Sequence, residues 1–348
     1  MRLAGGGMML KLFAHVALIA LVAAPAVAAP SPAGITAAAQ RPAAASVQQA
    51  VAAQVAALEK QIKGRVGVAF RLLETGESGA VAGAERFPMA STYKVAIAGT
   101  LLSLVDKGQM RLDRMIAVTQ ADVDQTGEVA NRVVHPGVML SVANLMELML
   151  TQSNNTATDK ILALAGGPAA VTAWLRANGI AEMQVDRSVN DLLNDFYGVP
   201  AGSPFVKTLM ARGLSDADIE KSAYSANAAF EKDPRDTSAP VAMVDLLGKL
   251  LASPLLKPES RDFLRSVMER CETGAARIKG LLPAGTTVAH KTGTIGGSIN
   301  DVGMITLPGD RGHLLIAVYT KSSSLPEAQR ERAIAEISRS LFDYFATR

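Results

Sequence analysis

The chain contains few cysteine, histidine and aromatic residues. Cys271 is the only cysteine among 348 residues, so an internal disulfide is excluded, and an odd thiol of this kind is expected to be buried. The four histidines stand far apart, at positions 15, 135, 290 and 313, without the short spacings of a zinc site. We therefore expect no metal and no other cofactor.

Positive and negative charges nearly balance, with 35 Lys and Arg residues against 32 Asp and Glu residues. The formal net charge is +3, and removal of the first 28 residues, which carry Arg2 and Lys11, would leave +1. No basic cluster stands out, so a nucleic-acid partner is not expected. We expect the protein to act on a small-molecule substrate and to be a monomer.

One long apolar run, residues 12–24, lies close to the start of the chain. Arg2 and Lys11 precede it, and Ala26-Val27-Ala28 fits a small-x-small cleavage site, which predicts a signal peptide over residues 1–28 and export to the periplasm. The alternative is an uncleaved membrane anchor, which Pro25 and the small residues after it disfavour. Residues 29–45 are an Ala/Pro/Ser linker.

Ser91-Thr92-Tyr93-Lys94 is the first of three short motifs. It opens an apolar stretch that is typical of a helix, and three residues of spacing place Ser91 and Lys94 on one helical face. A desolvated lysine there can take the proton of the hydroxyl and activate it as a nucleophile. Taken alone, the motif also fits a capping serine and a solvated lysine.

Ser153-Asn154-Asn155 follows an amphipathic segment, residues 141–151, and precedes another. On such an inter-helix loop the Ser153 hydroxyl can pass a proton to a leaving amine, and the Asn155 amide can bond both Lys94 and a substrate carbonyl. An ordinary helix-capping turn is the alternative for this motif alone.

Lys291-Thr292-Gly293-Thr294 ends an extended run and precedes Gly296-Gly297. An edge strand beside a nucleophile offers a backbone N–H for an oxyanion and a cation for a substrate carboxylate. A strand that merely ends in a turn would look the same. The three motifs together, in this order, are the signature S-x-x-K, S-x-N and K-T-G of penicillin-recognising serine enzymes.

From about residue 46 to its end, the chain resembles a class A serine β-lactamase. Besides the three motifs, residues 87–90 lead into Ser91 as in that family, Asp186-Arg187 would open an omega loop, and residues 233–237 would close it. The resemblance implies an acyl-enzyme on Ser91 and a β-lactam substrate. It also implies a substrate-carboxylate role for Arg277, fourteen residues before Lys291.

The expected fold is α/β (α+β). Strand patterns at residues 64–71 and 80–82 return only at 302–307 and 313–319, with helices between them and a terminal amphipathic helix at 326–345. This order predicts one antiparallel sheet built from both ends, flanked by helices, plus an all-helical part. Within a domain at 46–348, residues 46–87 and 237–348 would form the α/β part, and residues 88–236 the helical part, with the omega loop at 186–236.

The chain departs from the family where a Glu-x-x-Leu-Asn is usual. The corresponding residues run from Asn190 to Leu193-Asn194, so an amide stands where the family has the deacylation base. An amide can orient a water but cannot take its proton near neutral pH. Asn190 and Asn194 are nevertheless the candidate deacylation residues by position.

Forty-one residues separate Asn194 from Asp236, which indicates an insertion with helical patterns at 205–211 and 216–221. The missing base could be replaced by Asp191 or by a carboxylate of the insertion (Glu220, Glu231 or Asp233). The alternative is that no group replaces it. Three functions stay open: a β-lactam hydrolase, which we place first, a D,D-peptidase-like amidohydrolase, and a slowly deacylating β-lactam-binding protein.

Overall fold

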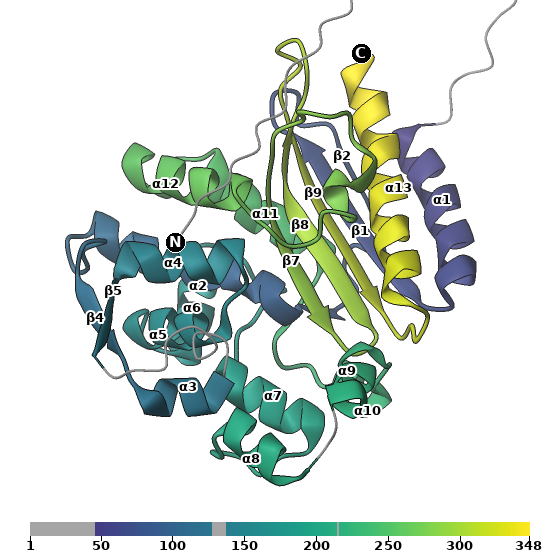
Figure 1. Ribbon diagram of the computed structural model, residues 1–348. Coiled ribbons are helices and arrows are strands. Elements are labelled where there is room, and N and C mark those ends of the chain that lie inside the picture. Colours follow the sequence, from purple (N-terminus) through teal and green to yellow (C-terminus); the bar gives the residue numbers. More distant parts are fainter. Residues whose placement is uncertain (1–45, 127–136, 214–215) are drawn as a thin grey trace, which may run out of the picture. The chain divides into compact units, whose positions relative to one another are not determined.

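The computed structural model describes residues 46–126, 137–213 and 216–348 (Figure 1). The predicted signal peptide and linker, residues 1–45, lie outside the described residues, as does His135. In the described ranges, no helix is long and apolar enough to span a bilayer.

A single five-stranded sheet organises the α/β part, with every neighbouring pair antiparallel and the order β2-β1-β9-β8-β7. The N-terminal strand β1 lies between β2 and the C-terminal β9, with Val68 opposite Val318. The predicted sheet from both ends of the chain is thereby confirmed. The strands are β1 (Arg65–Leu72), β2 (Ser78–Val81), β7 (Val288–Ile295), β8 (Ser298–Thr306) and β9 (His313–Lys321).

Helices cover both faces of this sheet (Figure 1). On one face, α1 (Val47–Ile62) and α13 (Glu327–Ala346) pack together and bury Leu58, Ile337 and Leu341 against the strands. On the other face lies α11 (Pro240–Leu251). Each buried aliphatic side chain of this kind contributes about 1.5–3 kcal/mol, so the sheet depends on helices from both ends of the sequence.

The helical part is built around α2, whose Val95, Ile97 and Leu101 are fully buried. Trp174 packs against the same core. The helices here are α2 (Lys94–Asp106), α3 (Gln120–Thr126), α4 (Val142–Thr151), α5 (Asn155–Leu164), α6 (Pro168–Ala177) and α12 (Pro258–Glu269). The remaining short elements are β3 (Phe87–Pro88), which pairs with β6 (Thr237–Ser238), β4 (Met115–Val118), which pairs with β5 (Val138–Ser141), and the 3-10 turns η1 (Ala90–Tyr93) and η2 (Ile278–Leu281).

Residues 186–236, the predicted omega loop, are closed at their ends by reciprocal bonds. The Asp186 N–H donates to Asp236 Oδ1 at 2.7 Å, and the Asp236 N–H donates to Asp186 Oδ2 at 2.9 Å. Buried Arg187 adds an ion pair to Asp236 at 2.6 Å. The segment contains α7 (Val189–Tyr197), α8 (Phe205–Ala211), α9 (Asp216–Tyr224) and α10 (Ala228–Lys232), so both helices predicted in the insertion are present.

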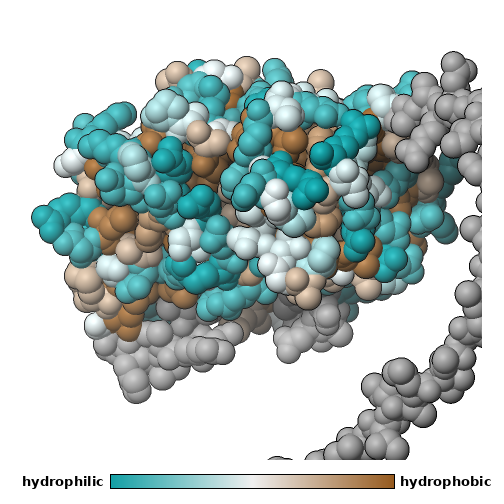
Figure 2. All heavy atoms as spheres, turned by 90° about the horizontal axis from the view of Figure 1, so that it is seen from above, coloured by the Kyte–Doolittle hydropathy of each residue, from teal (hydrophilic) through white to brown (hydrophobic). Residues whose placement is uncertain are grey.

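The face in Figure 2 shows hydrophilic and apolar residues interspersed over its described part. An apolar patch of the size that marks a stable partner interface is not visible on the described atoms of that face. Hydropathy therefore points to no docking surface on this side.

Candidate active site

Ser91 lies in the 3-10 turn η1, directly before α2, instead of in the first α-helical turn that the sequence predicts. Ala90 before it has a left-handed backbone, with φ 47°, which costs a non-glycine residue about 1 kcal/mol or more. Such strain persists only where surrounding contacts fix the backbone. Here those contacts hold the turn that carries Ser91.

Lys94 begins α2 and is fully buried. Its Nζ donates to the Ser153 carbonyl, to Ser153 Oγ at 3.2 Å and to Asn155 Oδ1 at 2.9 Å. Ser153 also has a left-handed backbone, with φ 59°, and Asn154 caps α5 through the Ala157 N–H. Lys94 thus joins the first two motifs in one hydrogen-bonded group.

Strand β7 approaches the Ser91 turn closely because residue 293 is glycine. A Cβ there would lie 2.5 Å from the Met89 carbonyl oxygen, which no other residue tolerates without movement of the backbone. Asn300 on β8 secures the same turn, since its Nδ2 donates to the Pro88 and Met89 carbonyls. The sequence analysis missed Asn300; a polar residue within a buried strand is the signal that could have found it.

A cavity of about 420 Å³ collects most of the predicted residues. Lys94 and Lys291 are fully buried, and neither lines the cavity; Lys291 donates to the Thr292 carbonyl at 2.9 Å. The predicted residues that line it are Ser91, Ser153, Asn155, Arg277, Thr292, Gly293 and Thr294. Folding therefore brings positions near 91, 153 and 291 to one place.

Arg277 lines this cavity, but every N–H group of its guanidinium already donates a hydrogen bond within the protein. Nε donates to Glu331 and Nη1 to the carbonyls of Gly293 and Asn300, while Nη2 donates to Thr294 Oγ1 and Glu327. These bonds use all five N–H groups that an arginine has. In this arrangement Arg277 fixes β7 against α13, and direct binding of a substrate carboxylate requires one of these bonds to open.

Asn190 and Asn194 are one helical turn apart on α7 and point the same way. Both side-chain amides donate to the Ser203 carbonyl, at 3.0 and 2.9 Å, and Asn190 Oδ1 accepts the Phe205 N–H at 2.9 Å. Neither residue lines either of the cavities that Ser91 lines. Their side chains are directed toward Ser203 and Phe205 instead.

The side of α7 toward Ser91 is apolar. A second, small cavity of about 70 Å³ is lined by Ser91 together with Val189, Leu192 and Leu193 of α7. Tyr93, Asn155 and Thr294 line the same cavity, so its polar groups come from elements other than α7.

The carboxylates that could replace the missing base have other contacts. Asp191 accepts from the Ser188 hydroxyl, Glu231 from Ser322, and Asp233 from Arg187 and Arg235. None of these three lines the two cavities at Ser91, and the side chain of Glu220 lies outside what the structure describes. Glu327 and Glu331 line the larger cavity, but both are paired with Arg277.

Asp159 on α5 was missed by the sequence analysis. Its carboxylate accepts the N–H groups of Val189 and Asn190 at 2.7 and 3.1 Å, and so holds the start of α7. Burial raises the pKa of Asp159, the two backbone bonds and the charge of Lys94 lower it, and the result is about 6. A carboxyl that titrates near neutral pH therefore sits within the field of Lys94.

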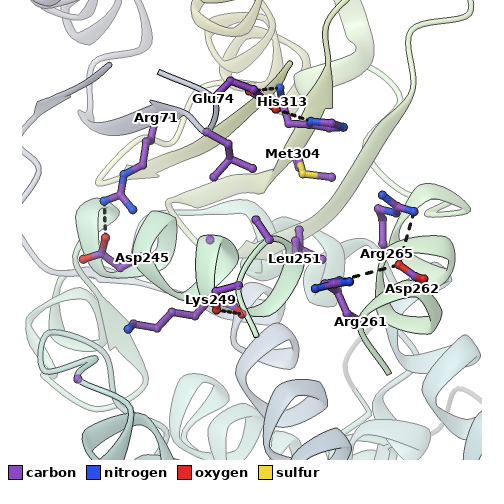
Figure 3. Close-up of a pocket in the computed structure, with 15 residues that line it drawn as sticks. Arg71, Glu74, Asp245, Lys249, Leu251, Arg261, Asp262, Arg265, Met304 and His313 are labelled. Atoms are coloured by element: carbon purple, nitrogen blue, oxygen red, sulfur yellow. Dashed lines mark hydrogen bonds and ion pairs between the residues drawn. The ribbon is translucent and has the colours of Figure 1, made fainter. Parts of the chain in front are cut away.

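A larger cavity, of about 900 Å³, opens elsewhere on the molecule (Figure 3). Arg71 pairs there with Asp245, and Arg265 with Asp262. No predicted site residue lines it. Across the described ranges, no group of three or more His, Cys, Asp or Glu side chains is arranged to hold a metal ion. The candidate site is therefore the cavity at Ser91.

Known proteins resemble this chain over most of its length. A sequence model of the β-lactamase enzyme family matches residues 50–345. The ancestral class A β-lactamase (GNCA) is 34% identical, with a TM-score of 0.69 over 84% of this chain and 99% of that one. A β-lactamase from Chitinophaga pinensis is 29% identical, with a TM-score of 0.69 over 85% and 99%. Together with the three motifs meeting at one cavity, these matches show that the chain belongs to the β-lactamase enzyme family and has the class A fold.

Proposed function

We propose that this protein is a serine β-lactamase that forms its acyl-enzyme readily and hydrolyses it slowly. The observation that carries the proposal is the single cavity lined by Ser91, Ser153, Asn155 and Thr292, with Lys94 hydrogen-bonded to two of these residues. Export to the periplasm through residues 1–28 and a monomeric state are part of the same proposal.

In the acylation step, Ser91 Oγ attacks the lactam carbonyl carbon and the ring C–N bond breaks. Lys94 and Ser153 carry the serine proton to the departing nitrogen. The backbone N–H groups of Ser91 and Thr294 stabilise the oxyanion, while Thr292 holds the substrate carboxylate beside the buried positive charge of Lys291. Arg277 supports this strand through the Gly293 carbonyl and the Thr294 hydroxyl.

Deacylation requires a water that loses a proton as it attacks the Ser91 ester. The α7 side chains beside Ser91 are apolar, and Asn190 faces Ser203 and Phe205. Lys94 with Ser153 is then the proton-accepting group nearest to the ester. We expect hydrolysis to limit turnover.

A chromogenic cephalosporin, mixed rapidly with the mature protein, tests the proposal. We expect a burst of one equivalent followed by a slower linear phase, an adduct on Ser91 in the intact mass, and neither in Ser91→Ala. A burst with no further turnover would instead identify a β-lactam-binding protein. Release of D-alanine from a peptide without cephalosporin turnover would identify a D,D-peptidase-like enzyme.

A further inference from the structure

Two carboxylates of α13 lie on one side of the cavity at Ser91. Glu327 and Glu331 are four residues apart on this helix, so their side chains share one helical face, and both residues line the cavity. Their side chains are 36% and 15% exposed. A substrate that fills the cavity therefore meets this face of α13.

Each carboxylate uses one oxygen on Arg277. Glu331 Oε1 accepts from Arg277 Nε at 2.9 Å, and Glu327 Oε1 accepts from Nη2 at 3.2 Å. The other oxygen of each glutamate, Oε2, has no hydrogen-bond or ion-pair partner among the residues that the structure describes. Two carboxylate oxygens on this side of the cavity are thus available to accept from a ligand.

The charges on this side of the cavity do not balance. Among the described residues that line it, one positive side chain, Arg277, stands against two negative ones, Glu327 and Glu331. Other cations lie behind the wall of the cavity, where they are fully buried, donate to backbone carbonyls and do not line it: Lys94, Lys291 and Arg330. A cationic group inside the cavity would therefore contact carboxylate oxygens, and an anionic group beside them would be repelled.

The two glutamates lie next to the place of the substrate carboxylate. Arg277 Nη2 bonds both Thr294 Oγ1, at 2.7 Å, and Glu327 Oε1, so these two oxygens are close neighbours. Thr294 and Thr292 are two residues apart on β7, which places their side chains on one face of the strand about 7 Å from each other. A substrate group that extends from Thr292 past Thr294 reaches Glu327 next.

Cephalosporin chemistry places a substituent at this point. The ring carbon that bears the carboxylate is bonded to the carbon that bears the 3-substituent, so the two groups are neighbours. With the carboxylate held by Thr292, the 3-substituent can extend along β7 toward Thr294 and Glu327.

We propose that Glu327 and Glu331 are specificity-determining residues that bind a cationic substituent next to the substrate carboxylate. The preferred substrates are then zwitterionic β-lactams, in which a positive group accompanies the carboxylate. This inference rests on the proposed function, because it names the substrate class of the same cavity.

The test compares two cephalosporins that are alike except for the ring on a 3-vinyl group, which is N-methylpyridinium in one and phenyl in the other. Stopped-flow mixing gives the second-order rate constant for Ser91 acylation by each compound and does not require deacylation. Dividing the pyridinium-to-phenyl ratio of a variant by that of the wild type cancels the intrinsic reactivities of the two compounds. We expect Glu327→Gln and Glu331→Gln each to lower this ratio about two- to fivefold, the size expected for a partly exposed ion pair.

Glutamine keeps an oxygen that can accept from Arg277, so both variants change the charge with little change in the contacts of the arginine. Glu336→Gln is the matched control, because Glu336 lies on the same helix, pairs with Arg332 and does not line the cavity. Its ratio should equal that of the wild type. The wild-type ratio should also fall at high salt, which screens exposed charges.

A ratio that high salt and both cavity variants leave unchanged overturns the inference, as does an equal fall in Glu336→Gln. Absence of acylation by either compound in the wild type would instead overturn the proposed function, so the two failures are distinguishable. If Glu331→Gln does not fold, Glu327→Gln decides, because its side chain is the more exposed of the two.

Discussion

Asp159 holds the start of α7 through its carboxylate, and Asn190 joins α7 to Ser203 and Phe205 through its amide. The sequence places an amide where the family has its base, which left open whether a water could still be oriented there. The contacts of Asn190 with Ser203 and Phe205 give it a structural role. Position 190 therefore carries an amide that is used in contacts between α7 and residues 203–205.

Asn190→Glu is the direct test of this residue. A glutamate cannot donate to the Ser203 carbonyl and would face it with a negative charge, so we expect lower thermal stability and less than about a threefold change in the deacylation rate. Decay of the acyl-enzyme by intact mass spectrometry measures the rate, with Asn190→Asp as the matched control. A deacylation rate raised a hundredfold would mean that the side chain reaches the ester.

Asp159→Asn tests the buried carboxyl. Because the folded pKa of about 6 lies above the ordinary value of 3.8, the folded state binds the proton more tightly. The wild type should therefore lose stability as pH rises from about 4 to 6, by up to about 3 kcal/mol. Urea unfolding of both proteins should show the variant gaining relative to wild type over this range. Parallel curves would place the pKa of Asp159 at its ordinary value.

At the scale of elements, residues 186–236 are closed by a buried cluster. Arg187 pairs with Asp236, Asp195 and Asp233, and its side chain is 5% exposed. Burial raises the pKa of Asp236 while the backbone bonds and Arg187 oppose it. Asp195 and Asp233 also pair with Arg235, whereas the buried Asp236 carboxylate has its ion pair with Arg187.

Arg187→Ala should destabilise the protein by about 3–5 kcal/mol, because it leaves Asp236 buried without its partner. Arg332→Ala is the control, since its pair with Glu336 is exposed on α13 and worth less than about 1 kcal/mol. Chemical unfolding of the two variants measures both values. Equal effects would show that the cluster does not hold the segment.

At the scale of the whole molecule, the site depends on elements far from Ser91 in sequence. Strand β7 carries Lys291 to Thr294, and its sheet is covered by α13, which also supplies Glu327 and Glu331. A loss of packing between α13 and the sheet should therefore also disturb the cavity at Ser91.

Leu341→Ala removes a fully buried side chain from the core between α1, α13 and the sheet. We expect a loss of about 2–5 kcal/mol and one cooperative transition, with Ser91 acylation lost at the same temperature as the circular dichroism signal. Arg339→Ala, at an exposed position of the same helix, is the control. Acylation that outlasts the folded signal would contradict this coupling.

The sequence by itself contained the three motifs and predicted the sheet built from both ends of the chain and the helices of the insertion. Local patterns are sufficient for these, because hydrophobic periodicity and short spacings act within a few residues. Only the tertiary structure decided which way Asn190 faces, that all five N–H groups of Arg277 are used, and that Lys94 joins Ser153 and Asn155 in one hydrogen-bonded group. These features are contacts between residues distant in sequence, and their partners exist only once the strands and helices have packed.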